Sequence, residues 1–178
     1  MRRFTNSVAQ ALRTSNWYAA LYLSLALPDI CARLEADNGK TSAARYMAWF
    51  DRFLAPRYRA VVGADAREHV FLSSNDCYAL RCTALHEGGS DISAQSLRQV
   101  ISRFHFTAVP GIHCNQFNSV LQLEVRVFCR DVCAAVDDWS AVFPLENPDK
   151  VGRLQELLLV HEQTDEVARG IVISTSTP

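Results

Sequence analysis

The residues best suited to chemistry lie in one short stretch, between Ser73 and Gly88. Within it, four residues separate Arg81 from His86. An imidazole takes up or releases a proton near neutral pH, and a guanidinium carries a fixed positive charge in a planar fork that fits a phosphate. Cleavage of RNA without a metal ion needs a base for the 2′-hydroxyl proton and a cation for the charge that develops on the phosphate oxygens. The pair could supply both.

The spacing also limits what one copy of the chain can do. Five residues along an α-helix turn about 500°, which leaves Arg81 and His86 about 140° apart. We therefore expect that a single chain cannot easily aim both at one phosphate. Near the end of a helix the macrodipole favours the protonated imidazole, and Glu87 acts in the same direction. This predicts an acid role for His86 in the free protein, and a base role would require other cations nearby.

Three further residues are predicted to support Arg81. Asp29, which follows Pro28, is the expected carboxylate partner that orients the guanidinium. Tyr78 and Cys82 flank Arg81 at helical spacing, and Tyr78 could stack on a base or donate a hydrogen bond, although core packing is the more common role of such a tyrosine. A purely structural interpretation makes Arg81 a half-buried ion pair with Asp29, and His86 a helix cap.

A second group of candidates lies later in the chain. Arg103 and His105 alternate with Phe104 and Phe106, so a strand here would have one cationic face. Such a face beside a groove would suit an RNA backbone, and these two residues are the predicted RNA-binding positions. The alternative is an ordinary solvated strand face.

The element that carries Arg81 and His86 is predicted to be a capped helix. Ser73 is the expected N-cap, Asp76 completes a capping-box pattern, and Gly88-Gly89 ends the helix. Helical periods are also expected over 5–36, with a kink or restart at Pro28, and over 42–56, 93–100, 129–142 and 151–162, with a short helical turn at 58–62. Residues 103–109 and 120–127 are expected to be strands joined as a loose hairpin.

These elements predict a mainly α protein: a bundle of four to five helices with a two-stranded antiparallel β-hairpin insert at about residues 102–127. We expect a single domain over residues 1–170 and a disordered tail over 171–178. A chain of 178 residues can bury a core of that kind.

The pattern Tyr-x-Leu-Arg-x(4)-His-x-Gly, from Tyr78 to Gly88, resembles the Arg-x(4–6)-His motif of HEPN-domain proteins. This all-helical family includes metal-independent ribonucleases of toxin–antitoxin and antiphage systems. The resemblance implies a HEPN-like bundle and a homodimer in which two Arg81 and two His86 line one groove. It further implies RNA as substrate, no cofactor and no metal, and a possible antitoxin protein as partner. A catalytically silent HEPN-like scaffold that binds a nucleotide, RNA or a partner protein is the alternative.

Two other site chemistries use the same region. Cys82 and His86, with His113 and Cys114, could in principle hold zinc, although no Cys-x(2)-Cys pair exists. Cys77, near the start of its helix, could have a lowered pKa and act as a nucleophile, but no oxyanion-type loop is visible.

The net charge and the apolar stretches of the sequence argue against some classes of protein. A net charge of −1 argues against a protein held on nucleic acid by overall basicity. The longest apolar stretch, residues 17–27, is too short for a membrane span, and no export signal is recognisable. The sequence therefore predicts a cytoplasmic protein without a membrane contact, whose six cysteines are reduced and mostly buried.

Overall fold

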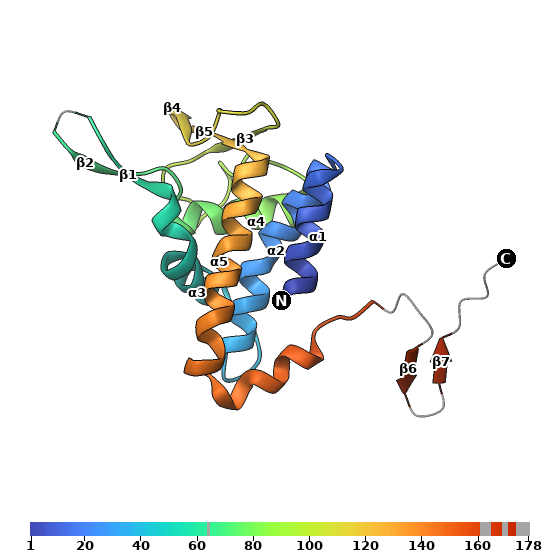
Figure 1. Ribbon diagram of the computed structural model, residues 1–178. Coiled ribbons are helices and arrows are strands. Elements are labelled where there is room, and N and C mark those ends of the chain that lie inside the picture. The colour runs from blue at the N-terminus through green and yellow to red at the C-terminus, as the bar shows by residue number, and fades with distance from the viewer. Residues whose placement is uncertain (64, 161–164, 169–170, 174–178) are drawn as a thin grey trace.

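The computed structural model describes residues 1–63, 65–160, 165–168 and 171–173, and this part of the chain is mainly α, as expected (Figure 1). The helices are α1 (Arg2–Arg13), α2 (Trp17–Glu35), α3 (Ala43–Trp49), the π-helical η1 (Phe50–Leu54), the 3-10 segment η2 (Ala55–Tyr58), α4 (Ser74–Glu87), α5 (Val125–Glu146) and the 3-10 segment η3 (Pro148–Glu156). The strands are β1 (Arg59–Val62), β2 (Arg67–Val70), β3 (Arg103–Thr107), β4 (Asn115–Phe117), β5 (Val120–Glu124), β6 (Asp165–Ala168) and β7 (Ile171–Ile173).

The first helical segment is divided at Ser15 rather than at Pro28. Ser15 has a φ of 56°, and the Asn16 side chain caps α2 by accepting a hydrogen bond from the Ala19 N–H. Pro28 lies inside α2 and is buried. A proline removes one helical hydrogen bond, but helix packing can outweigh that loss. The predicted restart at Pro28 is therefore wrong.

Local capping explains both ends of α4. The Ser73 hydroxyl accepts a hydrogen bond from the Asp76 N–H at 3.1 Å, and Gly88 ends the helix with a φ of 69°. Both predicted caps are present, but the Asp76 carboxylate has another partner. It accepts the N–H groups of Gln99 and Val100, at 2.7 and 3.3 Å. These bonds hold residues 93–100 as turns instead of the predicted helix.

The predicted β-hairpin insert is wrong in topology. β3 pairs with β5 in parallel, and β4 pairs with β5 antiparallel, which gives the order β3-β5-β4. The chain turns near Gly111, whose N–H donates to the buried Glu124 carboxylate at the far end of β5, and it returns along the other edge as β4. The central strand is the one whose Leu121 and Leu123 are fully buried.

The observed secondary structure also differs from the predicted one where the sequence pattern is weak. Residues 125–127, expected in a strand, start α5, at whose end the small sheet lies in Figure 1. The β1–β2 hairpin replaces a predicted helical turn, and its side chains are almost all exposed. The last predicted helix, over 151–162, is a 3-10 segment that ends at Glu156, and residues 161–162 lie outside the described part. Within the expected tail, 171–173 form β7, paired with β6, whereas 174–178 are not described.

Buried aromatic side chains form the core between the helices. Trp49, Trp139 and Phe143 are among the most buried, and Trp139 stacks on Phe143 with ring centroids 4.6 Å apart. The Trp139 indole N–H donates to Glu35 at 2.7 Å, which joins α5 to α2. This packing fixes α2, the helix against which α4 must be placed.

We expect Asp76→Ala to lower the free energy of unfolding by about 2–4 kcal/mol, because the hydrogen bonds that the buried Asp76 carboxylate accepts from two backbone N–H groups are lost. Urea denaturation followed by circular dichroism measures the change. Asp65→Ala is the control, since Asp65 is exposed and its 3.3 Å ion pair with Arg67 is solvated. Equal stability of the Asp76 variant and the native protein would contradict the role of this carboxylate.

Candidate functional site

A buried ion pair joins α2 to α4. The Arg81 Nε lies 2.5 Å from the Asp29 Oδ2, and the Asp29 and Arg81 side chains are only 12% and 21% exposed. The Thr41 hydroxyl donates to the other Asp29 oxygen at 3.1 Å. The structure thus places Asp29 where the sequence predicted it, as the partner that orients Arg81.

Arg81 remains charged in this environment. Burial alone would lower the pKa of the guanidinium, but the Asp29 charge, its hydrogen bond and a hydrogen bond with Cys82 outweigh burial and raise the pKa above its ordinary value. A fixed cation is therefore held just below the surface, at the middle of α4.

Arg81 also contacts His86 within the same chain. The Arg81 Nη1 lies 3.1 Å from the His86 Nε2, and His86 is exposed. The predicted angle of about 140° between the two residues therefore does not keep their side chains apart within one chain. Their Cα–Cβ directions diverge, but the long arginine side chain reaches across the intervening angle.

A guanidinium has hydrogen-bond donors and no acceptor, so in this contact the His86 Nε2 accepts with its lone pair. A general base needs such a lone pair, and Arg81 is a neighbouring cation of the kind that the base role was expected to require.

Tyr78 and Cys82 lie beside Arg81 on the α4 surface. Tyr78 packs edge-on against the buried Tyr46, with ring centroids 5.2 Å apart. Burial, followed by a hydrogen bond with Cys82, raises the pKa of Tyr78. Tyr78 therefore stays a neutral phenol, and part of its ring is used in packing against Tyr46.

Three other predicted residues stand apart from the Arg81–His86 contact. Glu87 is exposed in the last turn of α4. Arg103 forms an ion pair with Asp91 at 2.6 Å, and the His105 Nδ1 lies 2.9 Å from the Gln122 amide nitrogen. In the described part of the chain, Arg103 and His105 form no hydrogen bond or ion pair with Arg81 or His86.

Tyr22, on α2, lies beside the C-terminal end of α4, because a Cβ atom at Gly88 would be 3.9 Å from its hydroxyl oxygen. Tyr22 is 37% exposed.

The two rival chemistries find little support. Within the described residues, no group of three or more His, Cys, Asp or Glu side chains gathers closely enough to hold a metal. Burial raises the pKa of Cys77 to about 12, although a hydrogen bond with Tyr46 opposes it. The lowered pKa that a nucleophilic Cys77 would need is therefore contradicted.

A second polar cluster joins η2, α5 and the loop before β4, and the sequence did not predict it. The Tyr58 hydroxyl donates to Asp131 at 3.2 Å, and the His113 Nε2 lies 3.9 Å from the same carboxylate. Burial lowers the pKa of His113, although Asp131 and Glu124 oppose it. Burial raises the pKa of Asp131. The folded protein thus favours an uncharged ring at position 113.

No family model, curated protein or solved structure matches this chain. In the part of the chain that the structure describes, no helix has both the length and the apolar character needed to cross a bilayer.

The Asp29–Arg81 pair can be tested with a double-mutant cycle. We expect Asp29→Ala and Arg81→Ala each to lower the free energy of unfolding by about 2–4 kcal/mol, because each leaves a buried charge without its partner. The double variant should lose about 1–3 kcal/mol less than the sum. The exposed Arg52–Glu146 pair, at 2.5 Å, is the control and should couple by less than about 1 kcal/mol. Additive losses at Asp29 and Arg81 would disprove the coupling.

The His113 cluster predicts a dependence of stability on pH. Because the folded-state pKa of His113 lies below 6.5, the unfolded chain binds a proton first as the pH falls. Stability should therefore be lost on acidification from about pH 7 to pH 5. The loss should be smaller in His113→Gln, measured by denaturation at each pH. His105→Gln, at an exposed ring, should behave as the native protein. An identical loss in His113→Gln would refute this account.

Proposed function

We propose that the protein is a metal-independent endoribonuclease that uses Arg81 and His86, in a HEPN-like helical bundle. The observation that carries the proposal is the 3.1 Å contact between the Arg81 guanidinium and the His86 Nε2. It joins a fixed cation to an exposed imidazole on one protein surface. Asp29 holds the cation in position from α2.

The chemistry proceeds by exchange of hydrogen-bond partners. An RNA phosphate binds the Arg81 N–H groups, which releases the His86 Nε2 lone pair. This lone pair takes the proton of the 2′-hydroxyl, and the 2′-oxygen attacks phosphorus. The bond from phosphorus to the 5′-oxygen breaks, and a general acid protonates that oxygen. The products are a 2′,3′-cyclic phosphate and a 5′-hydroxyl end, with Arg81 stabilising the charge of the transition state.

The general acid is proposed to come from a second copy of the chain. After it accepts the 2′-hydroxyl proton, one His86 cannot also supply the proton that the leaving oxygen takes in the same step. A two-fold homodimer with both α4 surfaces facing one groove provides a second imidazole at the required place. One ring acts as base and the other as acid.

The activity of such a ribonuclease must be inhibited in the cell that produces it. We propose a cytoplasmic role in antiphage defence or in a toxin–antitoxin pair, with an antitoxin protein that covers the groove until it is needed. Arg103 and His105 are proposed to contribute cationic surface for the RNA backbone once Asp91 exchanges its partner.

The second candidate function is a silent scaffold that binds a nucleotide, RNA or a partner protein without cutting. It is favoured by the Asp29–Arg81 pair itself, because the carboxylate neutralises the guanidinium at 2.5 Å. A neutralised cation stabilises a transition state less than a free one.

The test is cleavage of RNA by the purified protein in excess chelator. We expect His86→Ala to lower the rate about 10²–10⁴-fold, because the base is lost. Arg81→Ala should lower it by at least about 10²-fold. Added imidazole should restore part of the rate to the His86 variant alone, since its side chain is exposed. End analysis should give 2′,3′-cyclic phosphate.

Arg33→Ala is the control, since Arg33 is an exposed arginine on α2, one turn from Asp29. This variant should cut RNA at the native rate. Cleavage that survives in His86→Ala, or that the chelator abolishes, would refute the proposal. A native protein that binds RNA and leaves it intact would instead support the scaffold.

A further inference from the structure

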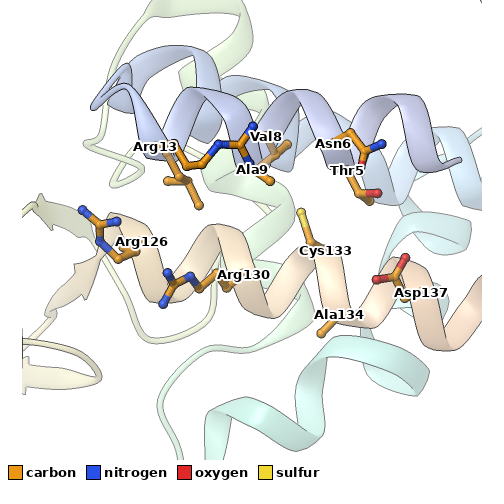
Figure 2. A pocket seen from close by; sticks show the side chains of 11 residues that line it. Thr5, Asn6, Val8, Ala9, Arg13, Arg126, Arg130, Cys133, Ala134 and Asp137 are labelled. Atoms are coloured by element: carbon orange, nitrogen blue, oxygen red, sulfur yellow. The ribbon is translucent and has the colours of Figure 1, made fainter.

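A groove between α1 and α5 gathers three arginines away from the Arg81–His86 site. The cavity measures about 530 Å³, in the range of small-ligand sites. Arg13 ends α1, while Arg126 and Arg130 are one turn apart on α5. Figure 2 shows these three residues, the arginine cluster, at one end of the groove.

The arginine cluster lacks a counter-charge in the described residues. None of its members forms an ion pair or a side-chain hydrogen bond there, whereas five other cations, Arg52, Arg57, Arg81, Arg103 and Lys150, are each paired with a carboxylate. The carboxylate that lines the groove, Asp137, lies toward its other end (Figure 2). It is seven residues from Arg130, about 10 Å along the helix axis. A bound anion would supply the paired counter-charge that these three guanidinium groups lack among the described residues.

Arg126 is held in an orientation that suits an anion. Its guanidinium lies over the Trp17 ring, 5.1 Å from the ring centroid. A guanidinium stacked on an aromatic face keeps its N–H donors in its own plane, free to bind oxygen atoms at its edge. Arg13 and Arg130 are exposed and can turn toward the same anion.

A neighbouring recess indicates the class of ligand. Trp17, Tyr18 and Phe106 line an apolar cavity of about 150 Å³, which also includes Val125, the residue before Arg126. We call it the aromatic recess. Trp17 lies at the boundary between this recess and the arginine cluster. An anion that carries a flat aromatic group would occupy both.

We propose that the arginine cluster binds the phosphate monoester of a nucleoside 5′-phosphate, with the base on Trp17 in the aromatic recess. A phosphate monoester carries close to two negative charges at neutral pH, which matches three guanidiniums better than the single charge of a phosphodiester. A carboxylate lacks the third oxygen that three arginines can share. The same group occurs on a free nucleotide and at the 5′ end of an RNA strand, and both present it in the same way.

The probe for this site is AMP, and the readout is the fluorescence of Trp17. Trp49 and Trp139 are buried, so a stacked base should quench Trp17 selectively, and Trp17→Phe should abolish the signal.

Arg126→Ala and Arg130→Ala should each weaken AMP binding about tenfold or more, because each removes a charge-assisted hydrogen bond. Arg130→Glu should weaken AMP binding more than Arg130→Ala does. Arg33→Ala should leave AMP binding unchanged. Calorimetry supplies a second measure of affinity, and circular dichroism checks that the variants fold.

Adenosine should bind more weakly than AMP, as should inorganic phosphate. A 5′-phosphorylated oligonucleotide that binds far better than its 5′-hydroxyl form assigns the site to RNA ends, whereas AMP binding alone assigns it to free nucleotides. Either result supports the proposal. It is overturned if adenosine binds as well as AMP, if Arg126→Ala and Arg130→Ala bind AMP as the native protein does, or if an acidic peptide binds the cluster and AMP does not. The site is independent of RNA cleavage, so His86→Ala should bind AMP normally.

Discussion

The Asp29–Arg81 ion pair is the constraint on which the candidate site depends. Transferring a carboxylate and a guanidinium out of water costs free energy, and only close pairing with full hydrogen bonding offsets that cost. Thr41 supplies the further donor that Asp29 needs. The pair fixes the position of α4 against α2 and uses the Nε edge of Arg81, which directs the other end of the guanidinium to His86. The geometry of the surface thus follows from a contact beneath it.

The parts of this site that the sequence predicts are those governed by local chemistry. Ser73 and Gly88 set the ends of α4, because N-cap hydroxyls and left-handed glycines act on the nearest backbone groups. Asp29 could be matched to Arg81 because a buried cation requires a carboxylate. The Arg81–His86 contact could not be predicted from angles along a helix, since those angles describe Cβ directions and an arginine side chain extends well beyond its Cβ atom.

Features that depend on contacts between distant segments could not be predicted from the sequence. The alternation of Leu121 and Leu123 identifies a strand, but it does not show which neighbour it pairs with or in which direction. The position of Cys77 near a helix start suggests a reactive thiol, yet its burial in the core dominates and keeps it protonated. Arg13 is more than a hundred residues from Arg126 and Arg130, so only the packing of α1 on α5 reveals that they share a groove.

The order of the small sheet has a consequence for how the chain folds. β4 and β5 are joined by a tight turn in which Asn118 adopts the left-handed conformation, so they can meet early and with little loss of chain entropy. β3 contacts β5 only after residues 108–119 have closed into a loop, and such a closure is entropically more costly. We therefore expect the β4–β5 ribbon to form first and to serve as the template onto which β3 adds, with the sheet completed late relative to the helices.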